Sequence, residues 1–169
     1  MKKIALCGLF TALIVVGAWI SIPFGQVPFT LQVLFVFLAG FLLDERHALL
    51  STAAYLLLGA LGLPVFAGFK GGAHVLVGPT GGYLFGFVVG AFLIALLSKS
   101  KKTFVGHFLV GLPGLAVIYL LGVVVLSLYV GGMEKAVTVG VLPFIWLDLL
   151  KLLIASLVAT RLKKMEVFK

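Results

Sequence analysis

The sequence predicts an all-α integral membrane protein, a single-domain bundle of six transmembrane helices formed by residues 1–169. Hydrophobic residues make up 63% of the chain and charged residues only 11%, whereas soluble domains average about 45–50% and about 25%. A spanning helix needs about 20 apolar residues, so six helices use roughly 120 and leave no room for a second domain. The apolar runs cover approximately residues 4–22, 29–43, 48–63, 81–97, 104–130 and 141–160.

Each of the first five runs is followed by residues that interrupt a membrane helix. Pro23 ends the first run and Pro64 ends the third, because proline lacks a backbone N–H and does not fit a helix interior. The charged segment 44–47 follows the second run, and the serine- and lysine-rich segment 98–102 follows the fourth. The glycine pair 131–132 follows the fifth run. The sixth run ends in a basic tail, so every expected helix has a defined end.

The distribution of lysine and arginine predicts the orientation of these helices. If the N-terminus is cytoplasmic, ten basic residues fall on the cytoplasmic side, and only Lys70 and Lys135 fall outside. Cytoplasmic segments of membrane proteins are enriched in Lys and Arg, and five or seven spans would scatter the clusters over both faces. We therefore expect six spans with cytoplasmic N- and C-termini. The ten residues are Lys2, Lys3, Arg46, Lys99, Lys101, Lys102, Arg161, Lys163, Lys164 and Lys169.

Composition and motifs argue against several classes of function. The net charge of +8 comes from short clusters between apolar runs, not from the basic stripe of a nucleic-acid-binding surface. Cys7 is the only cysteine, so it forms no intramolecular disulfide and no thiolate cluster. His47, His74 and His107 lie at no metal-ligand spacing, and the glycine-rich segment 78–82 lacks the spacing and the Lys-Ser/Thr of a P-loop. We therefore expect no cofactor, no metal site and no ATPase activity in this chain.

Asp148 and Lys151 are two ionisable residues inside the sixth apolar run. Each would cost about 2.5 to 3.5 kcal/mol at the centre of a lipid-facing helix. At a separation of three positions they share one helical face, so each offsets the charge of the other and both face protein or water. An ion pair between helices with no further role would meet this requirement. We favour a ligand contact, because ionisable groups at membrane depth more often mark a substrate path.

The connection between the third and fourth runs, residues 62–83, is rich in glycine but also apolar and aromatic. A solvated linker would be polar. Gly71-Gly72 and Gly81-Gly82 allow positive φ and close approach of the backbone. Phe66, Phe69 and Tyr83 supply flat surfaces that could cover an apolar ligand. We interpret this connection as a lid or pocket wall. The alternative is a re-entrant loop that only packs against the bundle.

Gly8 and Ala12 form a small-x-x-x-small pair in the first run. Such pairs let another helix approach closely. The second helix could belong to the same bundle or to a partner subunit, and the two interpretations have equal support.

The chain resembles the BioY family, the biotin-binding S-components of energy-coupling factor (ECF) transporters. The similarity is spread over nearly the whole chain, and the glycine-rich stretch combined with the Asp-x-x-Lys pair is specific to this family. Gly8 and Ala12 stand where such families use alanines. The matching stretches are residues 20–24 (ISIPF), 27–32 (VPFTLQ), 62–67 (GLPVFA), 78–87 (GPTGGYLFGF) and the Asp148-x-x-Lys151 pair.

The resemblance implies a multi-pass protein of the cell membrane that captures biotin from outside and releases it inward. The first and third loops and the last three helices would form the pocket. The expected partners are biotin, membrane lipid, an ECF transmembrane coupling subunit and two ATP-binding-cassette (ABC) ATPases, with no nucleic acid; self-association is also compatible with the family. ATP hydrolysis would come from the ATPases, and the S-component would topple in the membrane to release its substrate.

The resemblance also assigns roles to particular residues. Asp148 and Lys151 are expected to be polar anchors for the ligand, because biotin carries ureido N–H donors, a carbonyl and a carboxylate. Gly8 and Ala12 are expected to contact a partner. The further expected ligand contacts are Thr30, Gln32, Phe66, Tyr83 and the backbone of Gly81 and Gly82.

Three other functions are compatible with parts of the sequence. The first is an S-component for another small vitamin that bears a carboxylate, and the second is a channel or a carrier that works alone. The third is a membrane-embedded enzyme that uses Asp148 and Lys151 as an acid–base pair. The enzyme is disfavoured because such enzymes usually converge several His, Glu or Asp on the pocket.

Overall fold

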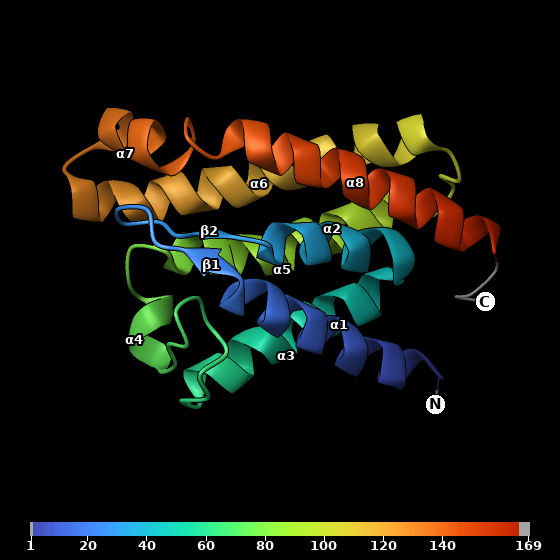
Figure 1. The fold of residues 1–169 in the computed structure, drawn as a ribbon, viewed down its shortest axis with the longest axis horizontal. Helices are drawn as coiled ribbons and strands as arrows, with labels where there is room; N and C mark the ends of the chain where they lie inside the picture. The colour runs from blue at the N-terminus through green and yellow to red at the C-terminus, as the bar shows by residue number, and fades with distance from the viewer. Residues whose placement is uncertain (1, 166–169) are drawn as a thin grey trace.

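The computed structural model describes residues 2–165, and within them the chain forms eight helices and one two-stranded ribbon (Figure 1). The helices predicted from the six apolar runs are all present, and two short helices accompany them. The elements in chain order are α1 (Lys2–Trp19), β1 (Ser21–Ile22), β2 (Phe29–Thr30), α2 (Gln32–Leu42), α3 (Glu45–Ala60), α4 (Ala73–Leu76), α5 (Gly81–Ser98), α6 (Phe104–Val130), α7 (Met133–Gly140) and α8 (Ile145–Lys164).

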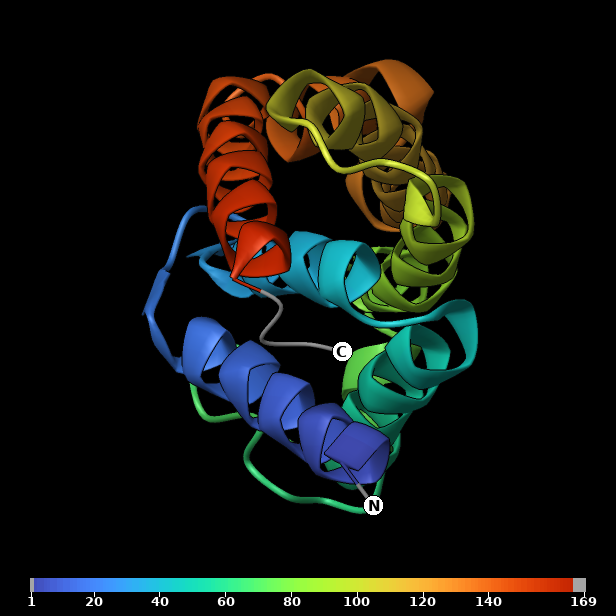
Figure 2. The same ribbon diagram turned by 90° about the vertical axis from the view of Figure 1, so that its right-hand side faces the viewer.

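The six long helices pack in three layers of two, seen along the bundle in Figure 2. α6 and α8 form one outer layer, α2 and α5 the middle layer, and α1 and α3 the other outer layer. The start of α1 and the end of α8 lie at the same end of the molecule in Figure 1, as an even number of passes requires.

The chain is an all-α membrane protein, as predicted. By length and hydropathy, α5 and α6 are each sufficient to cross a membrane, and α7 with α8, bent by 53° where they meet, forms a third candidate span. α1 and α2 are apolar but shorter. The number of six spans and the orientation of the termini therefore stay predictions.

The start of the second apolar run is the largest departure from the expected helices. Phe29 lies in β2 and pairs with Ile22 of β1, so that α2 begins only at Gln32. α2 has 11 residues and rises roughly 16 Å, about half of the roughly 30 Å thickness of the bilayer core. In Figures 1 and 2 the ribbon and its loop lie between the two outer layers.

The middle layer packs closely against α1 at a glycine. A Cβ atom at Gly17 would lie 2.8 Å from the Phe35 ring and 3.0 Å from the Gln32 nitrogen. The Leu31 N–H also donates a 3.0 Å hydrogen bond to the Gly17 carbonyl. Gly17 thereby permits the close contact that fixes the start of α2, and with it Gln32, beside the ribbon.

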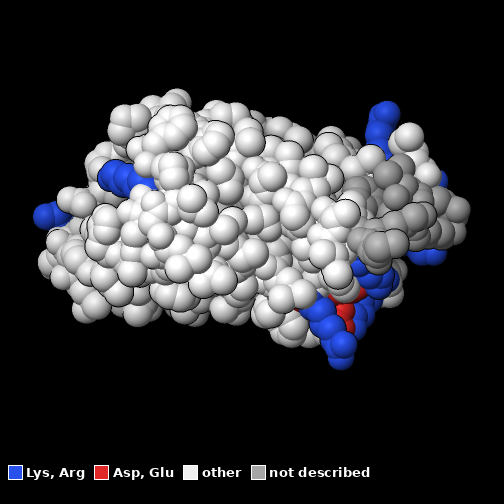
Figure 3. Space-filling view, turned by 90° about the horizontal axis from the view of Figure 1, so that it is seen from below, with Lys and Arg blue, Asp and Glu red and all other residues white. Residues whose placement is uncertain are grey.

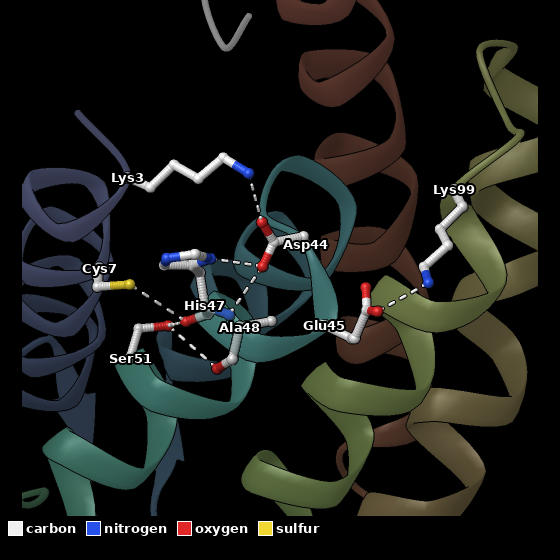
Figure 4. Close-up of polar contacts among 8 residues, drawn as sticks. All are labelled: Lys3, Cys7, Asp44, Glu45, His47, Ala48, Ser51 and Lys99. Atoms are coloured by element: carbon white, nitrogen blue, oxygen red, sulfur yellow. Dashed lines mark hydrogen bonds and ion pairs between the residues drawn. The ribbon is translucent and has the colours of Figure 1, made fainter. Parts of the chain in front are cut away.

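The charged segment after α2 caps α3 and ties three helix ends together (Figure 4). The Asp44 carboxylate accepts the His47 N–H at 3.0 Å and pairs with the Lys3 ammonium of α1 at 2.9 Å. Glu45 pairs with Lys99 at the end of α5 at 2.7 Å. Partial burial of Asp44 is outweighed by the hydrogen bonds from His47 and Lys3, which hold the pKa of this carboxyl well below its usual range.

The surface between the two ends of the bundle is apolar. Figure 3 shows Lys and Arg side chains gathered at the ends of the face that it presents, with an uncharged surface between them. Exposed side chains include Leu128, which is 81% accessible, and Trp146, which is 77% accessible. Large apolar side chains exposed in this number are typical of a surface that faces lipid.

Candidate functional site

A cavity of about 730 Å³ lies at the N-terminal end of α2. Its walls come from the loop between β1 and β2, the start of α2, the segment 61–80, and the facing sides of α5, α6 and α8. We call residues 61–80, which include α4, the lid segment. Of the residues predicted to contact a ligand, Thr30, Gln32, Phe66, Tyr83, Asp148 and Lys151 line this cavity.

Asp148 and Lys151 form an ion pair in the cavity wall. The Lys151 ammonium donates to Asp148 Oδ1 at 2.6 Å, and each side chain is only 7% exposed. α8 begins at Ile145, so both residues lie in its first two turns, on the face that points toward the cavity. The expectation that these charges face protein or water is confirmed, because both side chains are buried and line the cavity.

Each charge of the pair has a second partner. The Tyr119 hydroxyl of α6 donates to Asp148 Oδ2 at 2.5 Å. The Lys151 nitrogen lies 4.2 Å from the centre of the Phe29 ring, a cation–π contact. A buried ion pair is tolerable only when its remaining lone pairs and protons are also satisfied. Tyr119 satisfies one lone pair of Asp148, and Phe29 contacts the Lys151 ammonium. Both charged side chains also line the cavity.

A chain of side-chain hydrogen bonds fixes the polar group at the start of α2. The Thr30 hydroxyl donates to the Gln32 amide oxygen at 3.1 Å, and the Gln32 amide nitrogen donates to the Tyr55 hydroxyl at 2.5 Å. An amide nitrogen has two hydrogens and an amide oxygen two lone pairs, so Gln32 keeps one donor and one acceptor for a ligand. Its orientation is set before any ligand binds.

Tyr83 and Phe66 supply aromatic walls. The Tyr83 hydroxyl donates to the Gly140 carbonyl at 2.9 Å and so joins α5 to α7. Phe66 of the lid segment packs edge-on against Tyr55, with ring centres 5.5 Å apart. A Cβ atom at Gly59 would lie 2.0 Å from the Phe66 ring, so Gly59 makes the space in which this ring is buried.

Gly81 and Gly82 lie behind the cavity wall and not among the residues that line it. A Cβ atom at Gly81 would lie 1.9 Å from the Leu76 carbonyl oxygen, and one at Gly82 would lie 2.1 Å from the Leu121 carbonyl oxygen. These glycines bring α5 against α4 and α6. Their predicted backbone contact with a ligand stays a prediction.

Gly8 and Ala12 line a second hollow of about 720 Å³, which lies between α1 and α3. We call it the α1–α3 hollow. Both residues are exposed, and a Cβ atom at Gly8 would meet nothing within 4 Å. Gly8 therefore does not serve close packing within the bundle. The contact of this pair with a partner stays a prediction.

Sequence reasoning missed Tyr119, Phe29 and Tyr55. Tyr119 is a hydroxyl-bearing residue within a long apolar run, which was the one signal that could have identified it. Tyr55 carries the same signal, because its hydroxyl also lies within an apolar run. Phe29 gave no signal, because aromatic residues are common in membrane helices and loops. The roles of Phe29 and Tyr55 depend on contacts with Lys151 and Gln32 that only the fold creates.

Comparisons with known proteins agree on one family. The biotin transporter BioY of Thermotoga maritima is 60% identical over 167 residues, which cover 99% of each chain. The probable biotin transporter BioY of Pyrococcus horikoshii is 48% identical over 162 residues, or 96% of each chain. Among solved structures, the S-component for biotin from an ECF-type ABC transporter superposes with a TM-score of 0.90 at 28% identity, over 99% of this chain and 95% of that one. The sequence profile of the BioY family matches residues 1–167, and the chain belongs to this family.

Proposed function

We propose that this protein is the biotin-binding S-component of an ECF transporter. The observation that carries the proposal is the compensated Asp148–Lys151 pair in the wall of a cavity of about 730 Å³. The relatives that match nearly the whole chain are transporters named for biotin, so an acid–base enzyme has no support among them.

The chemistry of the cavity suits biotin. Small-molecule sites usually measure about 300–1,000 Å³ and combine apolar walls with a few placed polar groups. Phe66 and Tyr83 provide apolar surface for the ring system and the alkyl tail. Asp148 accepts hydrogen bonds, Lys151 donates them, and Gln32 can do both, which matches the N–H groups, carbonyl and carboxylate of biotin.

A binding titration of the purified protein tests this function. Asp148→Ala or Lys151→Ala should leave the protein inserted and weaken biotin binding by about 2 to 5 kcal/mol, because each strands the other charge. Glu134→Ala and Lys135→Ala are matched controls, since both residues are exposed and lie outside the cavity. Equal affinity in all four variants would remove the pair from the site. Competition by other carboxylate-bearing vitamins, together with mass spectrometry of the co-purified ligand, identifies the substrate.

The proposal extends to the transport assembly. We place the protein in the plasma membrane with six spans and cytoplasmic termini, and we assign the α1–α3 hollow to the coupling subunit, which joins two ABC ATPases. The solved relative is itself an S-component from an ECF-type ABC transporter. The open small-residue surface at Gly8 and Ala12 supports helix docking at this hollow.

Substitution in the α1–α3 hollow separates docking from substrate binding. Gly8→Leu should reduce co-purification with the coupling subunit and ATPases and leave biotin affinity unchanged, because it adds bulk only in the hollow. Val124→Leu adds bulk at an exposed position of α6 and should affect neither. Normal assembly of Gly8→Leu would contradict the docking site. Biotin uptake without the ATPases would instead indicate a carrier that works alone.

A further inference from the structure

Trp19 is the last residue of α1, and its side chain borders two hollows. Trp19 lines both the cavity that contains Asp148 and Lys151 and the α1–α3 hollow. Among residues 2–165 it is the one residue that lines both. A change at one hollow can therefore reach the other through a single side chain.

The Trp19 indole holds the lid segment in two ways. Its Nε1–H donates a 2.8 Å hydrogen bond to the Pro64 carbonyl. Its ring stacks on Phe69, with centres 5.3 Å apart and planes 27° apart. Phe69 itself lines the cavity and has a φ of +57°, a left-handed conformation that is uncommon outside glycine. The position of Phe69 over the cavity thus depends on what its ring contacts.

The remaining tethers of the lid segment lie elsewhere. The Gly72 N–H donates to the Gly59 carbonyl of α3 at 2.7 Å, and within the lid segment the Phe66 N–H donates to the Lys70 carbonyl at 2.9 Å. On the side away from α1, the Tyr129 hydroxyl of α6 donates to the Val77 carbonyl. The lid segment is therefore held by Trp19 of α1, by Tyr129 of α6 and by α3, where Gly72 bonds to Gly59.

We propose that Trp19 is a positioning residue that links the α1–α3 hollow to closure of the lid segment. The inference rests on the proposed function, in which a helix of the coupling subunit enters this hollow. A helix seated along α1 reaches Trp19 at the end of the hollow. Because one indole makes both lid contacts, a rotation of that side chain withdraws the hydrogen bond from Pro64 and the ring from Phe69 together. Docking thereby loosens the cover of the biotin cavity.

Amide hydrogen exchange of the intact protein in nanodiscs tests the link. Trp19→Phe removes the N–H donor and keeps an aromatic ring, and Phe69→Leu removes the stacking and keeps the donor. Each should speed exchange of the Phe66 and Gly72 amides by roughly 2- to 10-fold, the effect of one net hydrogen bond or ring contact. Addition of the coupling subunit with its ATPases should speed lid exchange in the parent protein and much less in Trp19→Phe.

Two controls make the result specific. Trp146→Phe alters the other tryptophan, which is exposed on α8, and should leave lid exchange as in the parent. Tyr129→Phe should loosen the lid segment and keep the full response to the coupling subunit, because Tyr129 does not border the α1–α3 hollow.

Three results would overturn the inference. The first is that Trp19→Phe exchanges its lid amides at the parental rate, and the second is that the coupling subunit speeds lid exchange equally in the parent and in Trp19→Phe. The third is that the coupling subunit does not change lid exchange in the parent. Biotin titration of the same samples tests the proposed function separately. A parent protein that does not bind biotin refutes that function. A parent that binds biotin, with a lid that is insensitive to Trp19, refutes only the link.

Discussion

Tyr119 and Asp148, on helices α6 and α8, are joined by a 2.5 Å hydrogen bond from the phenol to carboxylate oxygen Oδ2. Lys151 occupies the other oxygen at 2.6 Å. The carboxylate is thus held from two directions, and the orientation of its free lone pairs toward the cavity is set by both partners.

Tyr119→Phe should weaken biotin binding by about 10- to 100-fold, because a hydrogen bond to a charged group contributes about 1.5–3 kcal/mol. If Tyr119 acts by positioning Asp148, the same substitution in an Asp148→Asn background should have a much smaller effect. Isothermal titration of the four proteins measures this cycle. Equal losses in both backgrounds would show that Tyr119 acts independently of Asp148.

Stability and biotin binding should depend on the Asp148–Lys151 ion pair in different ways. Lys151→Met leaves Asp148 without its cation and should lower the free energy of unfolding by about 3–5 kcal/mol. Adding Asp148→Asn makes the pair neutral and keeps an acceptor for Tyr119, so it should restore much of the stability. Thermal unfolding in detergent measures this recovery. The double variant should still fail to bind biotin, and restored binding would argue against a role for the charges.

Two glycines provide a matched test of packing. Gly59→Ala places a Cβ atom 2.0 Å from the Phe66 ring, whereas Gly8→Ala meets nothing within 4 Å. Displacement of Phe66 should cost about 1–3 kcal/mol and should also weaken biotin binding, because Phe66 lines the cavity. Gly8→Ala should leave the melting temperature and the affinity near their parental values. Similar melting temperatures for the two variants would contradict the burial of Phe66 against Gly59.

The Asp44 cap should give the protein a pH-dependent stability. Because its folded-state pKa lies below the usual value of 3.8, the carboxylate contributes stability at neutral pH. That contribution is lost as the pH falls through about 4 and below. Asp44→Asn should therefore reduce the fall in melting temperature at acid pH. The measurement is the melting temperature from pH 7 to pH 3.

Thr103→Ala is the control for this effect. Thr103 caps α6 by accepting the Gly106 N–H at 3.1 Å, so its loss should lower stability by about 1 kcal/mol. A threonine cap does not titrate, and the pH dependence should stay parental. If both variants kept the same acid transition, Asp44 would not be its source.

The sequence predicted the helices well where a long apolar run lies between clear breaks. α6 begins and ends at the predicted residues, Phe104 and Val130, and the prediction for α5 differs by one residue at its end. These runs are specified locally, by hydropathy and by the glycines, serines and lysines that follow. The ends of such helices need no tertiary information.

Other elements were beyond local reasoning. α7 was missed because Glu134 and Lys135 make its start look like a polar loop. The ribbon was missed because Phe29 continues an apolar run, and only its pairing with Ile22 shows that it is extended. The sixth run was expected from residue 141, but α8 begins at Ile145 after a bend.

The candidate site divides in the same way. Asp148 and Lys151 could be identified because burial of charge in an apolar run is unusual and needs an explanation. Tyr119 and Phe29 complete that pair across the bundle. The hydroxyl of Tyr119 is unusual within an apolar run, but nothing in the local sequence indicates that its partner is Asp148. Gly81 and Gly82 were correctly seen as places of close backbone approach, but the approaching backbone is that of Leu76 and Leu121.

The short length of α2 has a consequence for how a bound ligand could leave the protein. Its 11 residues leave a chamber at one end of the molecule, while the large buried rings of Phe37 and Phe41 fill the bundle alongside α2. These rings separate the chamber from the far end of α2. A ligand held in the chamber would therefore reach that end only if the helices parted or the whole protein changed its orientation in the membrane.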